Sequence, residues 1–348
     1  MAKQASRPSG GVKLADVARL AGVSTATVSR ALSSPDRVGA DLLRRVEAAV
    51  RESGYVLDGA ARALRSGRTR TVGAAVPTLD NAIFANATHA LQKALEQKGY
   101  TLLVASHEFD LENEVRVVRP LVERGIDALV LVGLDHTPEL FQLLDAVRLP
   151  YVLTWALDRT GGRPCIGFDN RAAAARVADY VADLGHRRVA MIGGLSADND
   201  RARDRIAGTL EALRRRGVTV PPAWVLERPY TFDAARAAMR VLMREQPRPT
   251  VVICGNDVLA IGALAEARAL GLHVPADVSV TGFDDLEIAA LLEPPLTTVR
   301  VPSSDIGRLA AARVLDTLSG GEGERVREVP VELVVRRSTA PPPAGPAQ

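Results

Sequence analysis

The chain has 348 residues, of which 47% are hydrophobic and 24% charged, so it is long enough for two or three domains and has the composition of an ordinary globular protein. Its two cysteines, Cys165 and Cys254, lie far apart and in no ligand spacing, which excludes a disulfide scaffold and a zinc finger. No apolar run approaches the roughly 18 residues of a membrane span, and the start has no apolar signal segment, so we expect a cytoplasmic protein with no membrane partner.

The net charge of +3 is unevenly distributed along the chain. Residues 1–70 contain thirteen Lys and Arg against six Asp and Glu, a net of +7, so the remaining residues carry −4. A basic N-terminal region on a mildly acidic body indicates an anionic partner for that region. A solvated basic N-terminus would give the same count, so charge alone leaves both interpretations open.

Short helices joined by tight turns are predicted for the first part of the chain. LADVARLA (14–21) has small and apolar residues at helical spacing, and GVS (22–24) interrupts the pattern. TATVSRALS (25–33) follows Ser24, a favourable N-cap, and DLLRRVEAAVRESG (41–54) is a third helix. Two short helices with a three-residue turn containing glycine are typical of a helix-turn-helix, and an ordinary helical hairpin is the alternative.

The second of these helices carries the predicted DNA contacts. In a helix-turn-helix, the N-terminal end of the second helix reaches base edges in the major groove. Arg30 can donate two hydrogen bonds to guanine O6 and N7. Hydroxyl groups suit phosphate contacts, which position the protein rather than specify the sequence. The residues predicted to contact DNA from this helix are Ser24, Thr25, Ala26, Thr27, Ser29 and Arg30.

From Thr71 onward, apolar strands alternate with longer helices, which predicts βαβ units and parallel sheets. Strands are expected at 72–76, 101–106, 128–133, 151–155, 188–193, 250–254 and 278–283. Helices are expected near 84–98, 112–124, 171–184, 204–216, 232–245, 257–270 and 303–318. Open α/β sheets bind ligands at the carboxyl ends of their strands. The polar residues just past the expected strand ends are Asp80, Asn81, Asp169, Asn170, Asn256, Asp284 and Asp285.

Catalytic motifs are missing from the sequence. It contains no GxSxG, GxGxxG, GxxxxGK[ST] or HExxH, and its five histidines have no metal-ligand spacing. We therefore expect no enzyme activity, no cofactor and no metal site.

A family resemblance begins in the helix-turn-helix. VKLADVARLAGVSTATVSRAL (12–32) resembles the N-terminal signature of the LacI/GalR (lactose repressor) family of transcription regulators. The likeness continues through RVGADLLRRVEAAVRESGY (37–55), AARALRSGRT (60–69), LGHRRVAMIGG (185–194) and VPADVSVTGFDD (274–285).

The resemblance implies a fold and a domain order. The fold would be α/β: a small all-α helix-turn-helix head and a hinge helix, then a two-lobe, doubly wound body like a periplasmic binding protein. The implied parts are a DNA-binding domain at 12–56, a hinge helix or linker at 57–70, an effector-binding and dimerisation domain at 71–340, and a disordered tail at 341–348. The N-lobe would comprise 71–168 and 301–328, and the C-lobe 169–300 and 329–340.

The resemblance also implies site residues. In the family, two hinges fold together in the minor groove of operator DNA, where Leu64 would be the apolar wedge, Ala61 would pack at the groove floor and Arg62 would meet phosphate. The predicted effector-binding residues are Phe84, Trp155, Asp169, Arg205, Asn256 and Asp284. Phe84 and Trp155 would stack on a sugar ring, although Trp155 also suits a plain core position.

The leading hypothesis is a homodimeric transcription regulator, a repressor, that binds double-stranded operator DNA and a small effector between the lobes. The similarity of GFDN (167–170) and residues 282–300 to the gluconate-regulator branch of the family favours a sugar acid slightly over a neutral sugar. One alternative is a soluble periplasmic-type sugar-binding protein, which the basic head argues against. Another is a sugar-processing α/β enzyme with a fused head, which the missing catalytic motifs argue against.

Overall fold

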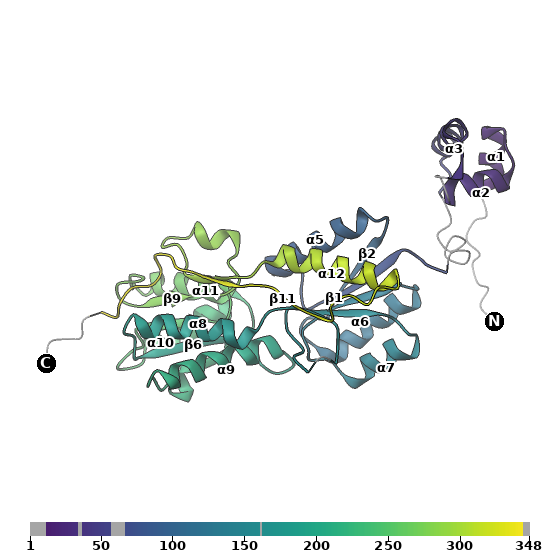
Figure 1. The fold of residues 1–348 in the computed structure, drawn as a ribbon. Coiled ribbons are helices and arrows are strands. Elements are labelled where there is room, and N and C mark those ends of the chain that lie inside the picture. Colours follow the sequence, from purple (N-terminus) through teal and green to yellow (C-terminus); the bar gives the residue numbers. More distant parts are fainter. Residues whose placement is uncertain (1–11, 34–36, 57–66, 161, 344–348) are drawn as a thin grey trace, which may run out of the picture. The chain divides into compact units, whose positions relative to one another are not determined.

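In a computed structural model of the chain, the described residues are 12–33, 37–56, 67–160 and 162–343. They belong to two compact units, one ending at Thr69 and one starting at Arg70 (Figure 1). The first unit is called the head and the second the body. No helix among these residues is long and apolar enough to span a membrane.

The head is built from α1 (Leu14–Ala21), α2 (Thr25–Ser33) and α3 (Ala40–Ser53). Gly22, between α1 and α2, has a left-handed φ of 63°, which glycine adopts without a steric penalty. A Cβ at this position would also lie 3.2 Å from the guanidinium of Arg45, which donates to the carbonyl of Ala21 at the end of α1. The small core that fixes the three helices consists of Val17, Ala18, Ala21, Val28, Ala31, Val46 and Ala49.

The first lobe of the body, the N-lobe, is built on a six-stranded parallel sheet with the order β11-β5-β4-β3-β1-β2. Its strands are β1 (Thr71–Val76), β2 (Thr101–Ser106), β3 (Ala128–Val132), β4 (Tyr151–Thr154), β5 (Cys165–Gly167) and β11 (Val326–Glu328). Its helices are α5 (Ala82–Glu96), α6 (Leu111–Glu123), α7 (Pro138–Ala146) and α12 (Ser303–Leu318).

Helices cover both faces of this sheet (Figure 1). Successive strand residues face opposite sides, so Ala74 and Val76 pack under α5 and α12, whereas Ala75 packs under α6 and α7. Burial on both faces explains why these strands read as continuous apolar runs.

The second lobe, the C-lobe, has a parallel sheet with the order β7-β6-β8-β9. Its strands are β6 (Val189–Gly194), β7 (Val225–Arg228), β8 (Val251–Cys254) and β9 (Ser279–Thr281). Its helices are α8 (Asn170–Asp183), α9 (Asp200–Arg215), α10 (Phe232–Met243) and α11 (Asp257–Ala269), with short 3₁₀ turns at Pro222–Trp224 and Glu287–Ala290. Val189 and Val251 pack under α8 and α9, and Ile192 and Cys254 pack under α10 and α11.

The chain passes between the lobes three times: from β5 to α8, from β10 (Thr298–Arg300) to α12, and from β11 to β12 (Glu332–Val334). β10 and β12 pair as an antiparallel ribbon. After β12 the chain runs along the C-lobe, where Ser338 and Ala340 bond β9 and His186. Of the tail expected from residue 341, Pro342 lies near Gly185, and residues 344–348 lie outside the described part of the chain.

Candidate DNA-binding and effector sites

The second head helix presents its N-terminal end to solvent. Thr25, Ala26 and Arg30 are exposed, whereas Thr27 and Ser29 are half-buried. Ser24 caps the helix: the backbone N–H of Thr27 donates to its Oγ over 3.1 Å, and the two hydroxyls lie 2.8 Å apart. The cap satisfies a backbone N–H in the first turn of α2 that has no partner within the helix.

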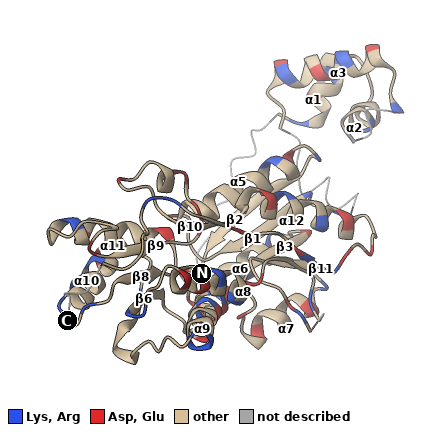
Figure 2. Cartoon of the chain, turned by 60° about the vertical axis from the view of Figure 1, so that its left-hand side comes forward, with Lys and Arg blue, Asp and Glu red and all other residues tan. Residues whose placement is uncertain are grey.

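Arg30 differs from the arginines around it. Arg19 pairs with Asp16 and Arg44 with Asp41, each one turn apart on its own helix. Arg30 makes no ion pair within the described residues of the head, so its guanidinium can bind another molecule without breaking one. Both signs of charge occur on the head helices (Figure 2). The predicted hinge contacts Ala61, Arg62 and Leu64 lie outside the described residues.

In the body, a small cavity lies where the two lobes meet. Its walls come from segments that follow β1, β2, β4, β7, β8 and β9, together with the first turns of α5 and α9, so it lies at the carboxyl ends of both sheets. The residues that line it are Asn81, Ile83, Phe84, Phe109, Trp155, Asn199, Arg201, Arg205, Tyr230, Asn256 and Asp284.

The structure places five of the six predicted effector-binding residues in this wall: Phe84, Trp155, Arg205, Asn256 and Asp284. It does not bring Asp169 there. Asp169 caps α8 by accepting from the N–H of Ala172 over 2.8 Å, and its carboxylate pairs with Arg159 at 3.0 Å. The next residue, Asn170, points inward instead and bonds Arg205.

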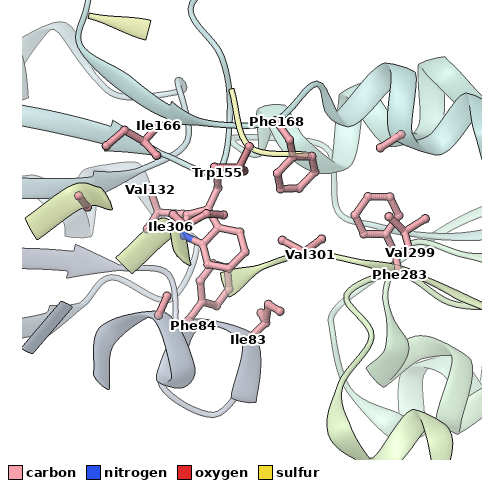
Figure 3. Packing of buried hydrophobic residues seen from close by; sticks show 14 of the residues in the cluster. Ile83, Phe84, Val132, Trp155, Ile166, Phe168, Phe283, Val299, Val301 and Ile306 are labelled. Carbon is pink, nitrogen blue, oxygen red and sulfur yellow. The ribbon is translucent and has the colours of Figure 1, made fainter. Parts of the chain in front are cut away.

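One wall of the cavity is aromatic. The rings of Phe84 and Trp155 meet edge to face with their centroids 5.1 Å apart (Figure 3). Trp155 also belongs to the N-lobe core, so both sequence interpretations of this residue apply together. Across the cavity, Phe109 of the N-lobe contacts Tyr230 of the C-lobe, with ring centroids 5.5 Å apart. These flat apolar surfaces suit the face of a sugar ring or another planar group.

Arg205 of α9 lies at the base of the cavity and is almost fully buried. Its guanidinium stacks 3.8 Å from the ring centroid of Phe283, which itself stacks on Phe168 (Figure 3). It donates to the carbonyl of Gly255 over 3.0 Å and to Asn170 over 2.9 Å. Burial lowers the pKa of Arg205, and the nearby charge of Asp284 opposes that shift.

Asp284 faces Arg205 from the loop after β9, with 3.8 Å between its Oδ1 and the guanidinium. Burial raises the pKa of Asp284 to about 7, although Arg205 acts to lower it. Its backbone has a φ of 120°, a conformation that non-glycine residues rarely adopt and that is common at ligand sites. The carboxyl therefore changes its charge near neutral pH inside the cavity.

Contacts between the lobes hold the cavity closed. The start of α9 bonds the loop after β3: Asp200 accepts from the N–H of Leu134 over 3.0 Å, and Arg201 donates to the carbonyl of Val132 over 3.3 Å. Arg203 pairs with Asp135 at 2.8 Å. We call this set, residues 132–135 and 200–203, the latch.

The closed cavity has a volume of about 30 Å³, room for roughly two water molecules. Ligand sites usually measure at least about 300 Å³. In this state the cavity is therefore too small to hold a whole sugar.

Comparison with known proteins supports the assignment of both units. The model of bacterial regulatory proteins of the lacI family matches residues 13–58, and that of the periplasmic binding protein-like domain matches residues 178–339. The HTH-type transcriptional repressor CytR of Escherichia coli (strain K12) is 34% identical over 328 residues, which cover 93% of this chain and 95% of that protein. The chain belongs to the LacI family of bacterial regulatory proteins. It is a DNA-binding transcription regulator, as the sequence predicted.

Solved structures of the LacI family have the same architecture. The lac repressor dimer bound to operator superposes with a TM-score of 0.84 at 27% identity, covering 95% of this chain and 99% of that one. The CelR–cellobiose complex has a TM-score of 0.70 at 31% identity, covering 94% of this chain and 99% of that one. Both alignments extend over the head and the body, so the α/β fold with a helix-turn-helix head is confirmed.

Several lining residues escaped the sequence prediction. Asn81 follows a strand and was noted as a polar strand-end residue, and that position was the available signal. Arg201 and Tyr230 had no comparable signal, because a helical arginine and a loop tyrosine are usually exposed. Their burial depends on how the second lobe faces the first.

Proposed function

We propose that this regulator is a homodimeric repressor whose operator affinity is controlled by a sugar acid bound between the lobes. The observation that carries the choice of effector is the charge of the cavity wall. Arg201 and Arg205 line it, and among the described residues that line it Asp284 is the only acid. Because Asp284 is partly protonated near neutral pH, the wall carries net positive charge and suits a carboxylate.

A neutral sugar is the second candidate. Asn81, Asn199 and Asn256 offer amide groups to hydroxyls, and the solved CelR structure contains cellobiose. Two observations weigh against it here. Two arginines, Arg201 and Arg205, line the cavity, and within the described residues Arg205 uses two of its five N–H donors, on Asn170 and Gly255. A carboxylate binds these arginines more strongly than a hydroxyl does, because hydrogen bonds between two charged groups are about twice as strong as those between neutral groups.

Calorimetric titration of the full-length protein with sodium D-gluconate, D-glucose and cellobiose tests this choice. We expect gluconate to bind at least about tenfold more tightly than either neutral sugar, since an Arg–carboxylate contact contributes roughly 1.5–3 kcal/mol. Arg205→Gln should abolish the preference for gluconate. Arg214→Gln, a change of an exposed arginine on the same helix, should leave it unchanged. Tighter binding of glucose or cellobiose by the wild type contradicts the sugar-acid proposal.

For DNA, we propose that α2 of each subunit reads one half-site of a near-palindromic operator, with Arg30 at a guanine. The observation that supports this is the exposed Arg30, which makes no ion pair within the described residues, next to the capped first turn of α2. Selection of bound sequences from random DNA should return an inverted repeat, and sedimentation of the complex should give two chains per duplex. A single, unrepeated site bound by one chain contradicts the dimer.

A further inference from the structure

Asn170, the first residue of α8, contacts cavity residues of both lobes without lining the cavity itself. Its side-chain Nδ2 donates to the carbonyl of Trp155 over 2.8 Å. Its Oδ1 accepts from the Nε–H of Arg205 over 2.9 Å. Asn170 is 2% exposed, so both bonds are shielded from water.

The chemistry of the two partners fixes the orientation of the amide. A backbone carbonyl only accepts and an arginine Nε–H only donates, so the side chain between them must present a donor on one side and an acceptor on the other. Asparagine meets both requirements within its short length. Aspartate would keep the acceptor and lose the donor, and alanine would lose both.

Each partner needs a restraint. Trp155 has a φ of 72°, a left-handed conformation that costs an aromatic residue free energy and persists only when its surroundings enforce it. Arg205 is a long side chain whose guanidinium must stay in one plane on the ring of Phe283. The bonds from Asn170 restrain the backbone of Trp155 and the side chain of Arg205 at the same time.

We propose that Asn170 is a positioning residue of the effector site, which sets the geometry of Trp155 in the N-lobe and of Arg205 in the C-lobe together. This inference rests on the proposed effector site in that cavity. Asn170 lies three residues after β5, where the chain first passes from one lobe to the other. Its amide therefore lies between the two contact residues at the crossover.

The first test needs no effector. The chain has two tryptophans, so a Trp224→Phe background leaves Trp155 as the only fluorophore of its kind. We expect Asn170→Ala and Asn170→Asp each to shift the emission of Trp155 to longer wavelength and to raise its quenching by acrylamide. Thr209→Val is the matched control, because Thr209 is equally buried on α9 and its hydroxyl has no hydrogen-bond partner among the described residues. Emission and quenching that stay unchanged in both Asn170 variants overturn the proposal.

The second test separates positioning from general stability. Gluconate affinity is measured for Asn170→Ala, Arg205→Lys and the double variant, because Lys keeps the charge but lacks the Nε–H that Asn170 binds. If Asn170 acts through Arg205, the double variant should bind gluconate at least about threefold more tightly than the product of the two single losses in affinity predicts. Additive losses overturn the proposal.

The two tests also distinguish this inference from the proposed effector. If the wild type does not bind gluconate, the sugar-acid proposal fails, and the fluorescence of Trp155 still decides the role of Asn170. If Asn170→Ala does not fold, Asn170→Asp keeps the bond to Arg205 and carries the same fluorescence test.

Discussion

The titration of Asp284 makes a sharp prediction for effector binding. Asp284 is buried beside Arg205, and its pKa is raised to about 7. Below that pH its carboxyl is neutral, and the cavity arginines are left to bind the carboxylate of the effector. Above that pH the ionised carboxyl pairs with Arg205 and repels an anionic ligand. Raising the pH through neutrality should therefore weaken gluconate binding.

The size of the effect follows from the pKa. If gluconate binds only when Asp284 is protonated, Kd scales as one plus the ratio of ionised to neutral carboxyl. Between about pH 6 and about pH 8 that factor grows about tenfold, or about 1.4 kcal/mol, and gluconate itself stays ionised throughout. Asp284→Asn should remove the dependence, because the amide has no charge to lose.

Calorimetric titration at constant ionic strength across this range measures the dependence directly. Asp233→Asn is a suitable control, because Asp233 is an exposed acid on α10. Glucose is a second control, because a neutral ligand should not weaken as Asp284 ionises. Gluconate affinity that stays level or rises with pH in the wild type would refute the reasoning.

Three further predictions concern the latch, the reading helix and the division into units. Gly133 has a φ of 94°, and a Cβ there would overlap the guanidinium of Arg201. Gly133→Ala should therefore hold the lobes apart and raise the radius of gyration measured by X-ray scattering. An unchanged radius of gyration would argue against the latch. Arg30→Ala should weaken the free energy of operator binding by roughly 1–3 kcal/mol per half-site and relax the sequence preference. A selection experiment that finds the same preferred sequence for this variant would show that α2 docks differently. Residues 71–348 alone should form a dimer that binds effector but not operator, and operator binding by this fragment at moderate salt would contradict the assignment of DNA binding to the head.

Several strands found from the sequence bury consecutive apolar residues, as β1 and β3 do. The strands that escaped prediction are β5, β7, β10, β11 and β12. Four of them have three residues each, too few to show a period, although β9 is equally short and was found. β11 joins the first sheet beside β5 although a whole lobe separates them in sequence. Such a pairing is set by the return of the chain from the C-lobe, which local pattern does not encode.

The candidate effector site was predictable where it depends on strand ends and less so elsewhere. Asn256 and Asp284 follow strands of a parallel sheet, and the sheet edge brings them together. The sequence analysis predicted Asp169 as an effector-binding residue, whereas the structure turns its neighbour Asn170 toward Arg205. At a helix start, one residue caps the backbone and the next turns toward the core, and the sequence does not show which of two polar neighbours does which.

The distribution of residue types over the two lobes indicates how an effector closes the cleft. The C-lobe supplies the charged groups Arg201, Arg205 and Asp284, whereas the N-lobe supplies the aromatic pair Phe84 and Trp155. A ligand shifts the opening equilibrium only by its differential affinity for the two states.

We expect the carboxylate to bind the C-lobe in both states, because its partners all lie in that lobe. Contacts between the sugar face and the N-lobe aromatics form only when the lobes close on it. The charged end would therefore determine how tightly the effector binds, and the apolar face would determine how far it drives closure. An effector that keeps the carboxylate but lacks the ring should bind without driving closure.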